Sequence, residues 1–233
     1  MGDSRQQKSR SYLPTGAMGA STGSQDAFNL AWKMALVLGG QADPSLLATY
    51  EEERFPVGKL MVEQTVQRFF YRTSSGPSSL IDDASLIFGY RYQHGAVIAE
   101  SDTAKTPLTQ HPSTLSGEPG TRAPHIMLQR AGEQLSTIDL FGRNFVVLVG
   151  EEGPPWIPAA HTVADRLGIP LDTWQIGPDG LHDVEGRWYT AYGVSPTRMT
   201  LVRPDGFVAW RSPALKPQPE QVLEDILTRV LRK

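Results

Sequence analysis

Residues 73–122 divide the chain into two parts with different hydrophobic patterns. This segment is rich in Ser, Thr, Pro and Gly, with SSGPSS near its start and HPSTLSGEPGTRAP near its end. Such a composition predicts loops and a linker. Within it, only Phe88–Ala99 is expected to be ordered, as one or two strands. We therefore expect a helical portion over 1–72, a loop-rich linker over 73–122 and a separate domain over 123–233.

Helices are predicted on the N-terminal side of this linker. Ser24–Leu38 carries apolar residues at helical intervals and ends on Gly39-Gly40, a pattern typical of a helix C-cap. A second helix is expected to begin at Asp43-Pro44, with Asp as N-cap and Pro in the first turn. Pro56 is expected to interrupt or kink it, and Val57–Tyr71 to be helical again.

The C-terminal part alternates strands and helices. The order strand, helix, strand, hairpin, helix predicts a thioredoxin-like α/β sandwich, and the RPDG sequence of residues 203–206 is a turn signal for the hairpin. The predicted elements are strands at Phe145–Val149 and Leu171–Ile176, a hairpin of Thr197–Val202 and Phe207–Trp210, and helices at Pro155–Leu167 and Glu220–Leu231. The fold class is therefore α/β.

Composition excludes several classes of function. The chain has no Cys, which excludes disulfides, thiolate zinc sites, iron–sulfur ligation and dithiol exchange. With 22 basic and 25 acidic residues the net charge is −3, so binding to nucleic acid or an anionic membrane is not expected. The start of the chain lacks the apolar run of a signal peptide, and the stretch around Met34–Leu38 is shorter than the roughly 20 residues of a membrane span, so a cytoplasmic location is expected. No metal site is expected, because the five histidines have no ligand spacing: His94, His111, His125, His161 and His182.

A glycine-rich run precedes the first predicted helix. Gly16, Gly19 and Gly23 fall within eight positions of the sequence PTGAMGASTGSQDAFNLAWK, residues 14–33. Glycines allow close backbone approach, and helix N-terminal N–H groups attract an anion or a polarised oxygen, so a pyrophosphate or the electron-rich edge of a flavin would suit this place. The spacing alone leaves open a flexible loop that merely caps a helix.

Several motifs in the same order resemble the aromatic-ring flavoprotein monooxygenases, the class A group that includes phenol and polyketide hydroxylases. The run 14–33 resembles their second FAD-contacting segment, and the similarity extends over about residues 12–233. The other motifs that show this similarity are TYEEER at 49–54 with Pro56, PGTRAPH at 119–125, LVRPDG at 201–206 and AWR at 209–211.

The resemblance implies the C-terminal part of such an enzyme. Residues 1–72 would be the end of the FAD-binding domain, and the family's G-x-G-x-x-G fingerprint does not occur in these 233 residues. In the family, NADPH or NADH reduces FAD, and the reduced flavin activates oxygen for transfer to a phenolic or polyketide-type aromatic, often in secondary metabolism. Activity would then need an upstream half in the same or another polypeptide, so a missing N-terminal subunit or a homodimer is the expected protein partner.

The resemblance also implies cofactor-contacting residues, but no catalytic residue. The carboxylate of Asp3 would accept hydrogen bonds from the ribityl chain, and Pro14 would lie beside the flavin ring. Backbone amides of Gly19–Thr22 would face the pyrimidine edge of the flavin, with Ser21 where the family commonly has Asn. The full set is Asp3, Pro14, Gly16, Gly19, Ala20, Ser21 and Thr22.

A second hypothesis is a non-catalytic, thioredoxin-like interaction module or accessory subunit. The helix Ser24–Leu38 discriminates between the two, because without an upstream half it would expose an apolar face suited to docking or self-association. Glu51–Glu53 are expected on a solvated helix face, while the family likeness suggests an orienting contact for Arg54. The tryptophans of the C-terminal part are expected in the core or at an interface: Trp156, Trp174, Trp188 and Trp210.

Overall fold

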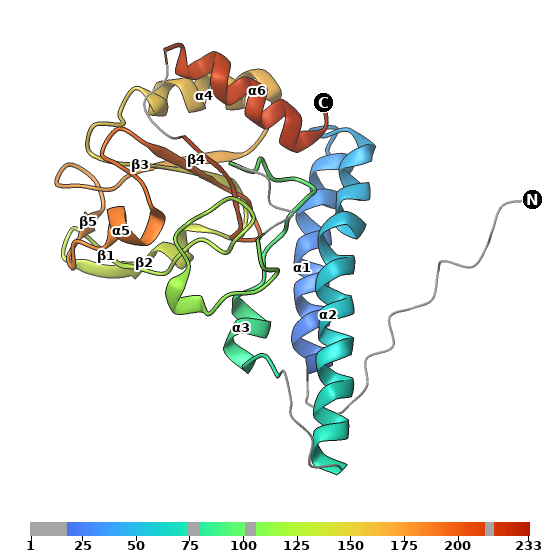
Figure 1. Ribbon diagram of the computed structural model, residues 1–233. Coiled ribbons are helices and arrows are strands. Elements are labelled where there is room, and N and C mark those ends of the chain that lie inside the picture. The colour runs from blue at the N-terminus through green and yellow to red at the C-terminus, as the bar shows by residue number, and fades with distance from the viewer. Residues whose placement is uncertain (1–17, 74–79, 101–105, 213–216) are drawn as a thin grey trace, which may run out of the picture.

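A computed structural model describes residues 18–73, 80–100, 106–212 and 217–233 (Figure 1). Two long helices, α1 (Met18–Leu38) and α2 (Ala48–Thr73), lie side by side along one edge of a layered α/β body. A short 3-10 helix, η1 (Pro44–Leu47), connects them. This is the mixed helix and sheet arrangement expected from the sequence.

Helix α1 begins earlier than predicted. The sequence analysis placed a glycine loop before Ser24, whereas α1 includes Gly19 and Gly23 from Met18 onward. A glycine in a helix costs only about 1 kcal/mol, and burial of Met18 together with a hydrogen bond from the Thr22 hydroxyl to the Met18 carbonyl (2.7 Å) stabilises the first turn. Tertiary packing thus outweighs the weak helix propensity of glycine.

Helix α2 continues through Pro56, so the expected interruption does not occur. Proline removes one N–H donor, and the burial of Val57 and Met61 on the same helix supplies packing energy that offsets this loss. At the start of the second helical segment, Asp43 caps as predicted: its carboxylate accepts from the Ser45 N–H at 2.8 Å. The first turn after this cap is the 3-10 helix η1 rather than α-helix.

Predicted strands at Phe88–Ala99 are wrong. The segment contains the end of helix α3 (Asp83–Phe88) and, within its described residues, only an isolated bridge between Tyr90 and Thr109. Its backbone pairs irregularly instead: the Tyr92 N–H donates to the Gly120 carbonyl, and the Ile98 N–H donates to the Ala209 carbonyl, both at 2.8 Å. The run is apolar because it packs against the C-terminal hairpin, not because it forms a ladder.

The main sheet has the predicted order of elements. Its strands are arranged β4-β3-β6-β7, with β3 and β4 parallel and the other pairs antiparallel. The parallel pair is connected by helix α4, and α4 and α6 pack together on one face (Figure 1). The bounds are β3 (Phe145–Val149), α4 (Trp156–Leu167), β4 (Leu171–Gln175), β6 (Met199–Val202), β7 (Val208–Arg211) and α6 (Pro219–Leu231).

A second, three-stranded sheet was not predicted. It has the order β2-β1-β5 and, with helix α5 (Trp188–Tyr192), covers the other face of the main sheet. Its strands are very short, and the turn between the first two has Ala131 at φ 51°, a residue that gives no turn signal. The bounds are β1 (Met127–Arg130), β2 (Glu133–Ser136) and β5 (His182–Asp183). A 3-10 helix follows β2 at Thr137–Leu140, and another lies at Pro112–Thr114.

Helix α1 shares a hydrophobic core with the main sheet. The ring of Trp32 meets the edge of Phe145 of β3, with centroids 5.7 Å apart. Phe145 belongs to the hydrophobic cluster between the main sheet and helices α4 and α6. The next residue, Val146, points to the opposite face of the sheet, toward the second sheet and α5. The predicted core role of the tryptophans holds for Trp156, Trp188 and Trp210, which are buried, and Trp174 is half-buried.

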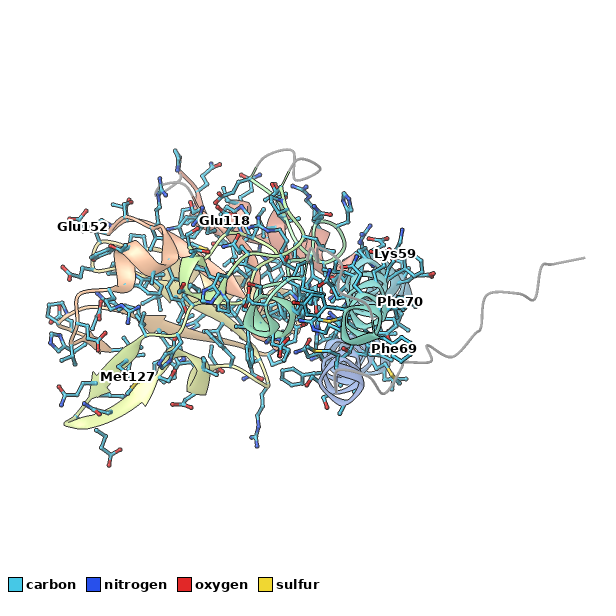
Figure 2. All side chains as sticks on the ribbon, turned by 60° about the horizontal axis from the view of Figure 1, so that its bottom comes forward. Lys59, Phe69, Phe70, Glu118, Met127 and Glu152 are labelled. Atoms are coloured by element: carbon cyan, nitrogen blue, oxygen red, sulfur yellow. The ribbon has the colours of Figure 1, made fainter. Side chains whose placement is uncertain are left out.

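The outer face of α1 is apolar. Its exposed large side chains are Phe28, Met34 and Leu38, and the remaining exposed residues of this fully described helix are Ala, Gly or Ser. None of the exposed residues of α1 is charged. On α2, Phe69 and Phe70 lie on the side of the molecule away from Met127 of β1 (Figure 2).

Candidate functional site

The predicted cofactor-contacting residues fall into two groups. Asp3, Pro14 and Gly16 lie outside the described residues. The other four begin α1: Gly19 and Ser21 are half-buried, Ala20 is exposed and Thr22 is buried.

The start of α1 can accommodate negative charge. The first N–H groups of an α-helix have no intrahelical partner and lie at the positive end of the helix dipole. No acidic residue occupies the first turn of α1, where Gly19 has no side chain and the methyl group of Ala20 is the only side chain of an exposed residue. This combination suits an anion or an electron-rich ring edge.

Thr22 supports the helix rather than presenting its side chain. Its hydroxyl donates to the Met18 carbonyl at 2.7 Å, and the residue is 1% exposed. In helical geometry the Thr22 N–H also pairs with the carbonyl four residues earlier. The Thr22 side chain is therefore already engaged within α1, and the expected contact of its backbone amide with the cofactor stays a prediction.

Arg54 of α2 holds the beginning of α1. Its Nε donates to Oδ1 of Asp26 at 2.6 Å, and its Nη2 donates to the Thr22 carbonyl at 3.5 Å. Its Nη1 donates to the Tyr92 hydroxyl at 3.3 Å. Burial alone would lower the pKa of Arg54, but Tyr92, Tyr90 and Asp26 raise it, so that the net shift is upward. Arg54 is thus a buried, permanent cation directed at the first turns of α1.

Four charged side chains form what we call the buried charge cluster: Lys33, Glu53, Arg203 and Asp205. All four are at most 3% exposed. Arg203 donates from Nη1 to Oε1 of Glu53 at 2.8 Å and from Nη2 to Oε2 at 2.9 Å. It also pairs with Asp205 through Nε at 3.0 Å and Nη2 at 2.5 Å. Lys33 completes the set through Nζ, 2.9 Å from Oε2 of Glu53.

The cluster joins three elements that are distant in sequence. Lys33 lies on α1, Glu53 on α2, and Arg203 and Asp205 in the turn between β6 and β7. Asn29 of α1 bridges the two carboxylates, because its Nδ2 donates to Glu53 at 2.6 Å and to Asp205 at 3.3 Å. The two cations and two anions balance in charge, and this pairing makes their burial tolerable.

Electrostatics in the cluster act unequally on its members. Burial would raise the pKa of Glu53, but Arg203 and Lys33 lower it to about 2. Burial, with a smaller contribution from Arg203, lowers the pKa of Lys33 to about 8, against the opposing effect of Glu53. The shared ion pair favours the charged form of both groups, and for Lys33 burial outweighs this effect. At neutral pH both groups are charged.

The predicted exposure of Glu53 is wrong. Glu51 and Glu52 are exposed as expected, but Glu53 is 1% exposed. A signal was present: Glu53 falls at four-residue spacing between Thr49 and Val57, which are both fully buried. The suggested orienting contact of Arg54 is present in the form of its bond to Asp26.

Two kinds of feature are absent from the described part of the chain. No group of three or more potential ligands among His, Asp and Glu is arranged to hold a metal ion. No helix there is long and apolar enough to cross a membrane.

Two family descriptions match the chain. Residues 116–233 match the C-terminal domain of aromatic-ring hydroxylases, and residues 9–65 match an FAD binding domain. The second range includes α1, η1 and the first part of α2. Together the matches include all members of the buried charge cluster.

Curated relatives match nearly the whole chain in sequence. A 4-methyl-5-nitrocatechol 5-monooxygenase from Burkholderia sp is 46% identical over 226 residues, which cover 94% of this chain and 41% of the relative. An aklavinone 12-hydroxylase from Streptomyces purpurascens is 40% identical, again over 94% of this chain and 41% of the relative. The chain thus spans about two-fifths of the length of these relatives.

Two solved structures also match nearly the whole chain. A ternary complex of aklavinone-11 hydroxylase with FAD and aklavinone matches with a TM-score of 0.88 and 39% identity, covering 95% of this chain and 42% of that one. A flavin-dependent monooxygenase in complex with FAD and substrate matches with a TM-score of 0.79 and 28% identity, covering 95% and 46%. The chain belongs to the aromatic-ring hydroxylase family.

Proposed function

We propose that this chain forms part of an FAD- and NAD(P)H-dependent monooxygenase that hydroxylates a phenolic or polyketide-type aromatic compound. In this reaction an aromatic C–H, O2, NAD(P)H and a proton give the aromatic C–OH, water and NAD(P)+. When bound, FAD supplies the electron transfer and the oxygen activation. In this proposal residues 1–72 end the FAD-binding domain, 73–122 form the linker, and 123–233 form the C-terminal domain.

The observation that carries the proposal is the start of α1. It lies within the range that matches an FAD binding domain, and it has small side chains and no carboxylate in its first turn. N–H groups of Gly19 and Ala20 would stabilise negative charge at the flavin edge, an electrostatic role that needs no side chain. Pro14, Gly16 and Asp3, which lie outside the described residues, remain proposed contacts by resemblance.

Activity would require the portion of the relatives that this chain does not match, in the same or another polypeptide. The apolar outer face of α1 supports this requirement, because a charge-free exposed helix face is suited to contact with further protein. The same face favours the second candidate, an accessory subunit that binds a partner without catalysis. A cytoplasmic location stays a prediction.

Co-expression tests the proposal directly. The chain would be produced together with the unmatched N-terminal three-fifths of the aklavinone 12-hydroxylase, purified as a complex and analysed for flavin absorbance after gel filtration. We expect retained FAD and NADPH oxidation coupled to hydroxylation of phenol or an anthracyclinone. A complex that forms but neither retains FAD nor oxidises NADPH would favour the accessory role.

A pair of serine variants tests the flavin contact itself. Ser21→Asp places a carboxylate in the first turns of α1, where it suits the helix dipole but repels an electron-rich ring edge. Ser24→Asp adds the same charge at an exposed position further along the helix. We expect FAD to be lost from the first variant and kept by the second. Equal retention would contradict the contact.

A further inference from the structure

Neighbouring residues of α2 connect two distant parts of the molecule. Glu53 is bound by Arg203 of the C-terminal hairpin turn through two hydrogen bonds of 2.8 and 2.9 Å. The next residue, Arg54, is bound to Asp26 and to the Thr22 carbonyl in the first turns of α1. A displacement of α2 at this point would therefore move both contacts together.

Helix α1 also contacts the hairpin turn directly. Asn29 donates to both Glu53 and Asp205, and Lys33 donates to Glu53. These contacts are buried, so water cannot replace a lost partner at low cost. The turn between β6 and β7 is consequently bound to the middle of α1, and through Glu53 and Arg54 to its beginning.

We infer that the C-terminal hairpin fixes the orientation of the first turn of α1, and that Arg203 and Arg54 are positioning residues for the cofactor contact made there. This inference rests on the proposed function for its consequence, namely FAD affinity. Neither arginine needs to touch the cofactor. Their effect would be to limit the motion of the amides of residues 19–21.

An exposed ion pair provides a matched control. Arg232, at the end of α6, donates to Glu52 of α2 at 3.2 Å, with both side chains about two-fifths exposed. It joins the same helix, one residue away from Glu53, to the same C-terminal part of the chain. It differs from the Arg203 contact in being solvated, so it should contribute little to orientation.

Hydrogen exchange of the 233-residue chain tests the positioning without any cofactor. For Arg203→Gln we expect exchange of the hydrogen-bonded amides in residues 22–26 to rise about tenfold or more, while amides of β3 stay within about twofold of the parent protein. Arg232→Gln should leave both regions unchanged. An equal rise throughout the protein, or no rise in residues 22–26, would overturn the inference.

A second variant keeps the test decisive if Arg203→Gln does not fold. Arg54→Lys retains the positive charge but cannot reach Asp26, Tyr92 and the Thr22 carbonyl together. The same local rise in residues 22–26 is expected. Unchanged exchange there in a folded Arg54→Lys protein would overturn the inference.

FAD titration of the co-expressed complex then separates the two proposals. We expect the FAD dissociation constant to rise about tenfold in Arg54→Lys and to be unchanged in Arg232→Gln. Failure of the parent complex to bind FAD would contradict the proposed function, while the exchange result would still decide whether the hairpin positions α1. Unchanged affinity in Arg54→Lys despite faster exchange would contradict the role in cofactor binding.

Discussion

Helices α1 and α6 border the same core but distribute their polarity in opposite ways. Helix α6 buries Leu223, Leu227 and Val230 and exposes Asp225 and Arg229, the usual pattern for a surface helix. Helix α1 buries Lys33 and Asn29 on its inner side, and its exposed side is uncharged. This difference indicates that α6 needs no packing partner beyond this chain, because its outer side is polar. Helix α1 instead has an inner face matched to buried charges and an outer face suited to an apolar neighbour.

The strongest test of this comparison is removal of the buried anion of α2, Glu53, that binds Lys33 and Asn29 on the inner side of α1. Glu53→Gln leaves Lys33 and Arg203 without their shared anion, and we expect a loss of about 3–5 kcal/mol in unfolding free energy, measured by denaturant titration. Glu52→Gln is the matched control, and its expected loss is below about 1 kcal/mol. Similar losses in the two variants would show that burial does not distinguish these neighbours.

Substitutions on the buried side of α6 should change the unfolding free energy through packing alone. Leu227 is fully buried, so Leu227→Ala should cost about 2–5 kcal/mol through lost transfer energy and the cavity left behind. Leu38→Ala on α1 removes the same atoms from a residue that is 81% exposed, and we expect a change within about 0.5 kcal/mol. Thermal and denaturant unfolding of both variants measure the contrast. A large loss in the Leu38 variant would mean that its side chain is packed in solution.

Acid should weaken the buried charge cluster. The pKa of Glu53 is lowered from its ordinary value of 4.5 to about 2, so between these pH values the unfolded chain binds more protons than the folded one. Stability should therefore fall as the pH decreases from 4.5 to 2, by roughly 3 kcal/mol from this group. Denaturant midpoints measured across this window check the slope.

On the alkaline side, Lys33 changes the stability with the same sign as Glu53 does on the acid side. Lys33 has its pKa lowered from 10.5 to about 8, so the unfolded chain holds more protons between these values and stability from this group rises with pH.

The Glu53→Gln variant provides the control for the acid prediction. Glu53→Gln should flatten the dependence of stability on pH between 4.5 and 2, while Glu52→Gln should keep it. An unchanged acid slope in Glu53→Gln would assign the effect to other carboxylates.

The smallest expected change in stability lies on the outer face of α1. Met34→Lys should alter the unfolding free energy by no more than about 0.5 kcal/mol, yet it should reduce self-association measured by sedimentation velocity. Asp225→Lys on the exposed side of α6 introduces a lysine where no apolar contact is expected. If both variants sediment alike at high concentration, the outer face of α1 does not mediate association.

The predictability of each part follows from the range of the forces that shape it. The strand Phe145–Val149 was predicted with its observed bounds because five consecutive apolar residues can only be buried on both faces. The hairpin beyond it followed from the RPDG turn, whose chemistry is local. Burial of Glu53 depends on Arg203, 150 positions later, and no local pattern reports such a partner.

The predicted loop before Ser24 and the predicted strands at Phe88–Ala99 were wrong for a related reason. Gly19 and Gly23 favour a loop by propensity, but the packing of Met18 and Thr22 keeps this stretch helical. Tyr90 and Tyr92 have the alternation of a strand, yet Tyr92 stacks on Phe207, with ring centroids 4.3 Å apart, and Tyr90 packs beside both rings. In each case tertiary contact with a remote segment decided the local conformation.

The 150-residue separation of Glu53 and Arg203 has a consequence during synthesis on the ribosome. At about 5–20 residues per second, roughly 8 to 30 seconds pass between the appearance of these two residues. In that interval Glu53 of α2 lacks Arg203, and the apolar surfaces of α1 and α2 lack the sheet they pack against. The nascent helical pair is therefore a natural client for a chaperone until the hairpin emerges.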